Sequence, residues 1–218
     1  MKPFDPRIRR LQGARLYAIL DTSYVEPGRE VGIAEKLVEG GVDLIQLRAK
    51  KLALPAVEDL GKKLRAAIPS SGPLFILNDH PQLAAGTGAD GIHVGQDDLS
   101  VAEARTRAGT GTLVGKSTHS LAQAVAAEKE GADYLGVGPI FATPTKPDYA
   151  PVGSALIGRV RAAVRVPQFC IGGINEETLP QVLAAGAVRV VIVSALLRSA
   201  DIPAYCRRVR ELLKVVRP

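Results

Sequence analysis

The sequence predicts a parallel α/β protein, a single (β/α)8 barrel domain formed by residues 1–218. Short apolar runs typical of buried strands alternate with helical stretches about eight times. Several helical stretches end in Gly followed by Val or Ala, and most apolar runs stop abruptly at polar residues. About eight strand-helix units with right-handed crossovers are the number that closes such a barrel.

The predicted strands follow one another at regular spacing. Each is rich in Val, Ile, Leu or aromatic residues, and each precedes a helical stretch such as IAEKLVEGG or LPAVEDLGKKLRAAI. We expect strands at LYAILD (16–21), DLIQLR (43–48), LFILND (74–79), GIHVG (91–95), TLVGKSTH (112–119), YLGVGPIF (134–141), QFCIGGI (168–174) and RVVIVSALL (189–197).

A short pattern recurs where helical stretches give way to strands. The segments EGGVDLI, AGTGADGI, KEGADYL and AAGAVRV each place Gly before Val or Ala, directly ahead of the next apolar run. Glycine adopts the left-handed conformation that ends many helices, so the pattern is that of a helix end, a turn and a buried strand. Its recurrence indicates repeated βα units rather than a function.

Composition and charge limit the classes of partner. Aromatic residues make up only 4% of the 218 residues and Trp is absent, which argues against a base-stacking surface for nucleic acid. The formal charge of +6 favours anions in general, because small phosphates and nucleic acids use the same Lys and Arg chemistry. We expect small-molecule substrates and no nucleic acid.

Cysteine usage and the apolar runs indicate the compartment. Cys170 and Cys206 lie far apart, as expected for reduced thiols rather than a disulfide. Residues 1–13 form a basic N-terminal extension without the apolar stretch of a secretory signal, and no run approaches the roughly 20 apolar residues of a membrane span. We expect a cytoplasmic protein without membrane contact, and apolar surface on the outer helices would allow a homo-oligomer.

Polar residues after the second predicted strand suit a diphosphate. Gln46, Arg48 and Lys50 stand at alternate positions, so on a strand their side chains share one side. Arg can bind two oxygens through its fork, and Lys adds a point charge. The alternative is a solvated strand end that leads into a basic loop.

The third and fourth strands end in Asn78, Asp79 and Asp98. The carboxyl ends of parallel strands open on one face of a barrel, so these carboxylates can converge on one cation. We therefore expect a Mg²⁺ site that holds a phosphorylated substrate. The alternative is that Asp79 and Asp98 are helix N-caps, because helical stretches begin close to both.

The fifth and sixth strand ends add further polar groups. The fifth strand gives Ser117 and His119 in GKSTHS, although a lone His is more often a structural residue than a catalyst. His93 and His80 carry less weight still. The loop ATPTKPDYAPVG is longer than most connections in such proteins, and long loops at this end are usually functional. It offers Thr143, Pro144, Thr145 and Lys146.

The seventh and eighth strand ends resemble a phosphate site. The pair Gly172-Gly173 allows the backbone close to a ligand, and the loops after the last two strands are the recurrent anion site of this fold. Gly173, Val193 and Ser194 would supply backbone N–H groups. Many barrels share this feature, so it indicates a phosphate monoester without identifying it.

Taken in order, the motifs resemble the thiamine-phosphate synthase family over almost the whole chain. They are IQLRAK, LNDH, GIHVGQDD, GKSTH, GVGPIFATPTK and IGGIN followed by VSAL. The resemblance implies a (β/α)8 barrel and a transferase that joins 4-amino-2-methyl-5-hydroxymethylpyrimidine diphosphate to a thiazole phosphate, giving thiamine phosphate and diphosphate. One residue departs from the family pattern, because Ala49 stands where an acid is usual between Arg48 and Lys50.

The resemblance also implies roles for single residues. Asp79 and Asp98 would bind Mg²⁺, and Arg48, Lys50, Ser117 and Lys146 would be catalytic. The pyrimidine diphosphate would contact Gln46, Leu47, Arg48, Ala49, Lys50, Asn78, Ser117 and Lys146. The thiazole phosphate would contact Thr143, Pro144, Thr145, Gly173, Val193 and Ser194.

The expected mechanism is a dissociative substitution in which cations stabilise the departing diphosphate and the thiazole nitrogen then attacks. No protein nucleophile is required. Two other functions remain open. A thiazole tautomerase on the same barrel would use a His at position 119 and lack the metal-binding aspartates, and a phosphate-sensing barrel would need neither the diphosphate cations nor the metal pair.

Overall fold

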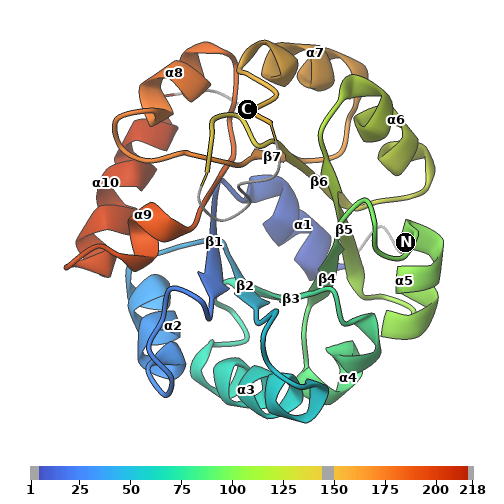
Figure 1. Cartoon of the computed structure of the whole chain (residues 1–218), viewed down its shortest axis with the longest axis vertical. Helices are drawn as coiled ribbons and strands as arrows, with labels where there is room; N and C mark the ends of the chain where they lie inside the picture. The colour runs from blue at the N-terminus through green and yellow to red at the C-terminus, as the bar shows by residue number, and fades with distance from the viewer. Residues whose placement is uncertain (1–4, 144–149, 216–218) are drawn as a thin grey trace.

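A closed barrel of eight parallel strands forms the centre of the molecule. The structure is a computed structural model that describes residues 5–143 and 150–215. Each strand pairs with the next one in the chain, and β8 pairs back with β1. Helices surround the ring of strands on all sides (Figure 1). The predicted (β/α)8 barrel is confirmed.

The strands are short and almost wholly buried, which explains why they read as continuous apolar runs. They are β1 (Leu16–Asp21), β2 (Leu44–Arg48), β3 (Leu74–Asn78), β4 (Gly91–Val94), β5 (Leu113–Thr118), β6 (Tyr134–Val137), β7 (Gln168–Cys170) and β8 (Val190–Ile192).

The helices that follow the strands bury one side against the barrel. The described helices are α1 (Pro6–Gly13), α2 (Glu30–Glu39), α3 (Leu54–Ala67), the 3-10 helix η1 (Pro81–Leu83), α4 (Ala84–Thr87), α5 (Val101–Ala108), α6 (Leu121–Lys129), α7 (Ala155–Ala163), α8 (Leu179–Ala184), α9 (Ser194–Leu197) and α10 (Ile202–Lys214).

Every predicted strand is present, but the last three end earlier than predicted, at Val137 instead of Phe141, at Cys170 instead of Ile174 and at Ile192 instead of Leu197. The apolar run to Leu197 was predicted to be one strand, and this was wrong, because β8 stops at Ile192 and Ser194–Leu197 is the helix α9. A short apolar run has no periodicity that separates a strand from a buried helix. The correction places Val193 and Ser194 at the junction between strand and helix.

Alternation along the strands divides the core into two layers. An outer layer between strands and helices contains Leu47, Phe75 and Ile92, all fully buried. An inner layer fills the barrel and contains Tyr17, Tyr134 and Phe169, whose rings meet edge to face. The inner layer forms a floor, and the site described below lies above it.

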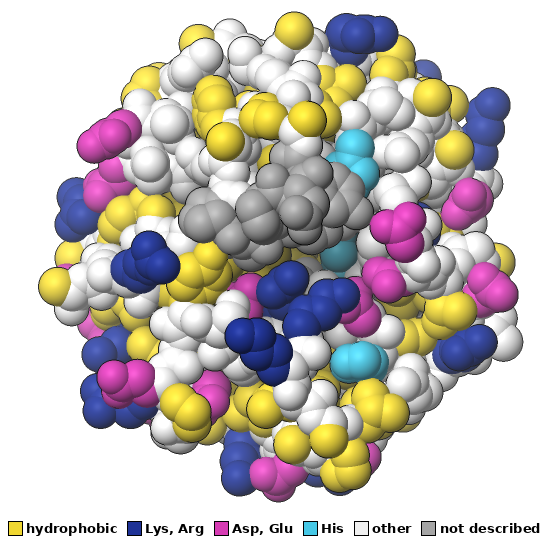
Figure 2. Space-filling view, in the orientation of Figure 1, with side chains coloured by type: hydrophobic (Ala, Val, Ile, Leu, Met, Phe, Trp, Pro, Cys, Tyr) yellow, Lys and Arg dark blue, Asp and Glu magenta, His cyan; other side chains and the backbone are white. Residues whose placement is uncertain are grey.

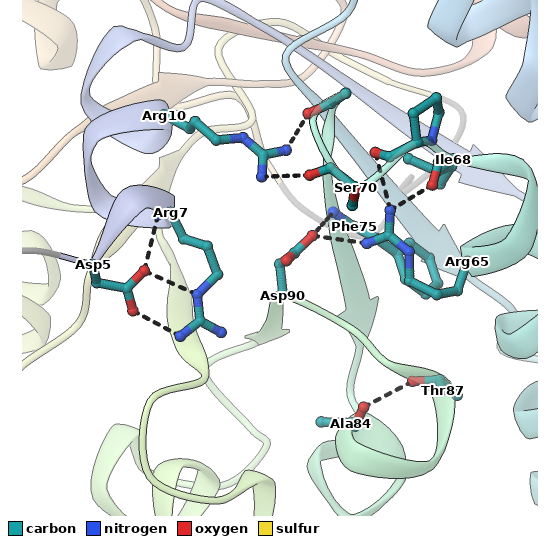
Figure 3. A network of polar contacts seen from close by, with 12 residues as sticks. Asp5, Arg7, Arg10, Arg65, Ile68, Ser70, Phe75, Ala84, Thr87 and Asp90 are labelled. Atoms are coloured by element: carbon teal, nitrogen blue, oxygen red, sulfur yellow. Dashed lines mark hydrogen bonds and ion pairs between the residues drawn. The ribbon is translucent and has the colours of Figure 1, made fainter.

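The basic N-terminal stretch forms a helix that closes one end of the barrel. Figure 1 shows α1 inside the ring of strands, and Leu11 on this helix is 2% exposed in the inner layer. Asp5 caps the helix by accepting the N–H of Arg7 at 2.9 Å. Arg10 donates to the carbonyl oxygen of Ser70 at 3.1 Å, which holds the helix to the loop before β3 (Figure 3).

The two cysteines are free and buried, and burial raises the pKa of each thiol to about 12. They are therefore protonated at neutral pH. None of the helices within the described ranges is long and apolar enough to cross a membrane.

Candidate active site

A cavity of about 300 Å³ opens at the end of the barrel where the strands stop. Figure 2 views the molecule from this end, and Lys and Arg side chains lie beside Asp and Glu side chains near the middle of the face. The cavity brings together eight of the predicted site residues, which come from six strand ends. They are Gln46, Arg48, Asn78, Ser117, Thr143, Gly173, Val193 and Ser194.

The side chains at the end of β2 are held by buried partners. Arg48 forms an ion pair with Asp21, whose side chain is 2% exposed, at 2.5 Å. Gln46 is buried and donates from its amide nitrogen to the hydroxyl of Tyr17 at 2.5 Å. Fixed donors that line a cavity are suited to orient a ligand, because little side-chain entropy remains to be lost on binding. The alternative of a solvated strand end is therefore wrong for Gln46 and Arg48.

The remaining members of the β2 motif lie elsewhere. Leu47 and Ala49 have their side chains in the outer core layer, so only their backbone atoms are available to a ligand. Lys50 is half exposed and forms an ion pair with Asp79. Pro144, Thr145 and Lys146 lie outside the described residues.

The two predicted metal ligands lie side by side. Asp79 follows β3 and Asp98 follows β4, and their carboxyl groups lie close enough for each to shift the pKa of the other. Burial raises the pKa of Asp79, and the Asp98 charge adds to this against the opposing effect of Lys50. Burial also acts to raise the pKa of Asp98, but the N–H of Gly95 at 2.6 Å and the contact with Asp79 outweigh it, so that pKa is lowered.

The backbone at Asp79 is strained. Its φ is 62°, and it is the one non-glycine residue with positive φ in the described chain. Such a conformation costs on the order of 1–3 kcal/mol and persists where the surroundings hold it. Here the N–H of Asp79 donates to the carbonyl oxygen of His93 at 2.9 Å, which ties the end of β3 to β4. This backbone conformation places the Asp79 carboxyl group next to that of Asp98.

The alternative role of these aspartates as helix caps is wrong. Ser100 is the N-cap of α5, where it forms a capping box with Glu103. His80, not Asp79, precedes η1. Neither carboxylate therefore caps the start of a helix. Among the described residues no group of three or more His, Cys, Asp or Glu side chains is arranged to hold a metal, so any ion here would rely on this pair and on a ligand.

A chain of hydrogen bonds beneath the cavity was not predicted. Gln46 contacts Tyr17, whose hydroxyl lies 3.2 Å from that of Tyr134. Tyr134 lies 3.2 Å from Nδ1 of His93, and Nε2 of His93 lies 2.9 Å from the hydroxyl of Ser117. Two predicted site residues, Gln46 on β2 and Ser117 on β5, are thus joined through the floor of the barrel. The only hint of this chain in the sequence is that Tyr17 and Tyr134 each place a hydroxyl group in an otherwise apolar strand.

His119, two residues after Ser117, also lines the cavity. Its Nδ1 donates to the carbonyl oxygen of Gly138, and its backbone N–H donates to the side chain of Gln123 at 2.6 Å. These bonds fix the ring against the loop after β6. The contacts describe a positioned side chain and do not by themselves assign it a role.

Glycine is required where the loop after β7 meets the loop after β6. Gly173 has a φ of 64°, and a Cβ atom there would lie 2.7 Å from the carbonyl oxygen of Ala142. Gly172, with a φ of 100°, would meet Pro139 in the same way. The close packing brings this backbone to the cavity, opposite the ends of β2 and β3 and next to Val193 and Ser194.

Similarity to known proteins identifies the family. The family model for thiamine monophosphate synthase matches residues 16–196. A thiamine-phosphate synthase of Shouchella clausii is 41% identical over 206 residues, which cover 94% of this chain and 93% of that protein. One from Gloeobacter violaceus is 44% identical over 193 residues, and the match covers 88% of this chain but only 55% of that longer protein.

Solved structures agree. A thiamine phosphate pyrophosphorylase from Pyrococcus furiosus superposes with a TM-score of 0.86 at 29% identity, covering 97% of this chain and all of that one. A geranylgeranylglyceryl phosphate synthase from Thermoplasma acidophilum, at a TM-score of 0.74 and 17% identity, shares the fold alone. As the sequence motifs predicted, the chain belongs to the thiamine monophosphate synthase family, whose named relatives are transferases.

Proposed function

We propose that this protein joins 4-amino-2-methyl-5-hydroxymethylpyrimidine diphosphate to a thiazole phosphate, giving thiamine phosphate and releasing diphosphate. One observation carries the proposal. A single cavity of about 300 Å³ has an amide and a guanidinium group at the end of β2 and glycine-rich backbone after β7. A volume of this size is typical of small-molecule sites, and the two polar regions suit two phosphorylated substrates.

The pyrimidine diphosphate would bind above the hydrogen-bonded floor. Gln46 and Ser117 end the chain of hydrogen bonds and suit the polar edge of a pyrimidine ring. Arg48 and Asn78 line the same cavity and suit phosphate oxygens. Lys50, half exposed and already next to the carboxylate pair, would add a mobile charge. Leu47 and Ala49 would take part through their backbone, and Lys146 is proposed on sequence alone.

The thiazole phosphate would bind at the opposite wall. Gly173 brings backbone close to the cavity, and Val193 and Ser194 follow β8 directly. Thr143 lines the cavity beside them. Pro144 and Thr145, outside the described residues, complete this proposal from the sequence alone.

Asp79 and Asp98 fit a divalent cation. Two carboxyl groups in contact, one with a raised pKa, repel each other when both are ionised, and a cation would relieve that repulsion. Mg²⁺ usually takes one or two protein carboxylates and completes its shell with water and substrate phosphates, so two suffice. We propose that this pair holds Mg²⁺, which when bound would supply positive charge to the diphosphate.

Arg48 and Lys50 would stabilise the negative charge that grows on the diphosphate as the bond to the pyrimidine methylene carbon breaks. The nitrogen of the thiazole, held at the other wall, would then form the new bond. No protein nucleophile is needed. Ser117 and His93 are hydrogen-bonded, but the other ring nitrogen of His93 faces the hydroxyl of Tyr134 rather than a carboxylate, so they do not form a Ser-His-Asp triad.

His119 in the cavity wall keeps a tautomerase as the second candidate. Incubation of the protein with both substrates distinguishes the two functions. The proposed synthase forms thiamine phosphate and diphosphate in equal amounts, and neither appears when one substrate is omitted. A folded protein that isomerises the thiazole but yields no thiamine phosphate would overturn the proposal in favour of the tautomerase, and one that binds phosphate without any turnover would indicate a sensor.

A further inference from the structure

A carboxylate-arginine arrangement repeats around the other end of the barrel. Three of the four recurrent segments place Asp two residues after a glycine, directly before or at the start of an even-numbered strand. Each carboxylate accepts a backbone N–H at or next to the start of the preceding strand. The bonds are Leu16 to Asp43 at 2.8 Å, Phe75 to Asp90 at 2.8 Å and Val114 to Asp133 at 2.7 Å.

Each of these carboxylates also pairs with an arginine from a surrounding helix. The pairs are Arg210 with Asp43 at 3.0 Å, Arg65 with Asp90 at 3.0 Å and Arg105 with Asp133 at 2.9 Å. Figure 3 shows the pair of Arg65 and Asp90, together with the backbone of Phe75. In two of the three, the arginine also donates to the carbonyl oxygen of the turn glycine. These bonds are Arg210 to Gly41 at 2.5 Å and Arg105 to Gly131 at 2.7 Å.

The fourth segment keeps the arginine and lacks the acid. Arg161 on α7 donates to the carbonyl oxygen of Gly186 at 2.9 Å, as Arg105 and Arg210 do to the turn glycines of their own segments. Gly186 has the same left-handed backbone, with a φ of 97°. Two residues later stands Val188, where the other segments have Asp. Within the described ranges Arg161 forms no ion pair, and it is exposed where its three counterparts are half buried.

A cavity of about 200 Å³ lies at this position, lined by Arg161, Arg165, Gln168 and Val188 and bordered by Arg189. Arg189 also borders the space beneath α1, where one terminal nitrogen donates to the carbonyl oxygen of Gln12 at 2.8 Å. The Nε of Arg189 is buried and has no hydrogen-bond partner. A buried donor without an acceptor is costly, and it is a donor that a ligand oxygen could satisfy.

The charge around this cavity is positive. Burial lowers the pKa of Arg189, and the nearby charges of Arg15 and Arg161 lower it further. Glu128, which borders the neighbouring space together with Arg189, accepts the backbone N–H groups of Arg165 and Val166 at 2.6 and 3.1 Å. It is therefore already engaged by the backbone.

We propose that this cavity binds a small oxyanion, such as inorganic phosphate, in place of the carboxylate that the other three segments carry. Arg161 would provide the guanidinium group that its counterparts offer to Asp, and Arg189 would add the buried Nε–H. The site lies at the opposite end of the barrel from the candidate active site. It does not depend on the proposed function.

Thermal unfolding in phosphate, compared with chloride at equal ionic strength, tests the proposal on the full chain. Two variants remove the site in different ways. Arg161→Gln removes the guanidinium group, and Val188→Asp places a carboxylate of the protein where the oxyanion would bind. Arg105→Gln is the matched control, because it removes the equivalent arginine from a segment that has its acid. Phosphate bound at the candidate active site contributes equally to all four proteins.

We expect the phosphate-dependent increase in melting temperature to be smaller in Arg161→Gln and Val188→Asp than in the wild type, with a loss of affinity of about tenfold in Arg161→Gln. Arg105→Gln should melt at a lower temperature in either salt but keep the full increase. An equal phosphate-dependent increase in all four proteins would overturn the proposal. Because Arg161 is exposed, its variant is expected to fold even if Val188→Asp does not.

Discussion

The two ends of the barrel use the same residue types in opposite ways. At the end closed by α1, Asp43, Asp90 and Asp133 each accept a backbone N–H and pair with an arginine. At the open end, Asp79 lies on a strained backbone and its carboxyl group is next to that of Asp98. The three carboxylates at the closed end are matched within the fold, and the pair of Asp79 and Asp98 at the open end is matched only in part.

The difference indicates where the fold gives up stability for a ligand. Matched carboxylates lower the free energy of the folded state, because each has donors in fixed positions. Burial of a carboxylate beside a second one raises it, and the pKa of Asp79 is raised by burial first and by the Asp98 charge in addition. Acidic residues at the two ends should therefore respond to substitution in opposite ways, one set through folding and the other through turnover.

The largest expected effect is on turnover at the open end. Asp79→Asn removes one of the two proposed metal ligands and should lower kcat for thiamine phosphate formation by about a hundredfold or more. The free energy of unfolding should stay the same or rise, since the repulsion with Asp98 is removed. Steady-state kinetics and urea unfolding on the same preparation measure both. Full turnover in this variant would contradict the metal role.

The matched substitution at the closed end should do the reverse. The Asp133 side chain is 4% exposed and bonded to Arg105 and to the N–H of Val114. Asp133→Asn should lower the free energy of unfolding by about 2 kcal/mol, because it weakens two charge-assisted hydrogen bonds. kcat should change little below the melting temperature. A large loss of kcat in a folded variant would show that the two ends are not separable.

The floor between the ends should control stability at alkaline pH. Burial raises the pKa of Tyr17 and of Tyr134, so both stay protonated in the folded protein after they ionise in the unfolded chain. The unfolded state then binds fewer protons, and the free energy of unfolding falls as pH rises above about 10. Urea unfolding at about pH 8 and about pH 11 should show a smaller fall, by roughly 1 kcal/mol, in Tyr17→Phe. An unchanged fall would mean that this hydroxyl ionises in the folded state.

The smallest effect is expected at His119. Its Nδ1 is bonded to the carbonyl oxygen of Gly138, and the proposed reaction assigns it no proton transfer. His119→Asn should keep kcat for thiamine phosphate formation within about threefold of the wild type, whereas a general base would cost about a hundredfold or more. A loss of that size would favour chemistry of the tautomerase kind at this end.

Much of this organisation could be predicted from the sequence. Buried parallel strands are apolar throughout and stop at the open end, so residues such as Gln46, Arg48 and Ser117 stood out as the first polar groups after or within them. Strand alternation also separates Gln46 from Leu47, although the prediction grouped them as ligand contacts.

Other features depend on contacts that no local pattern records. Tyr17 and Tyr134 read as part of apolar runs, and only closure of the barrel brings their hydroxyl groups together. The run that contains Ser194 had the composition of a strand and formed the helix α9. The meaning of Val188 depends on the structure, because only the structure shows that the equivalent Asp of each of the other three segments pairs with an arginine.

The dependence of thiamine phosphate formation on Mg²⁺ most directly tests whether Asp79 and Asp98 form a metal site. Both substrates are supplied to protein stripped with a chelator, and product is followed as Mg²⁺ is added back to the wild type and to Asp98→Asn. We predict that wild-type turnover requires Mg²⁺ and saturates, while the variant stays slow at concentrations that saturate the wild type. Turnover that is equally fast without Mg²⁺ would contradict the assignment of Asp79 and Asp98 as the metal site.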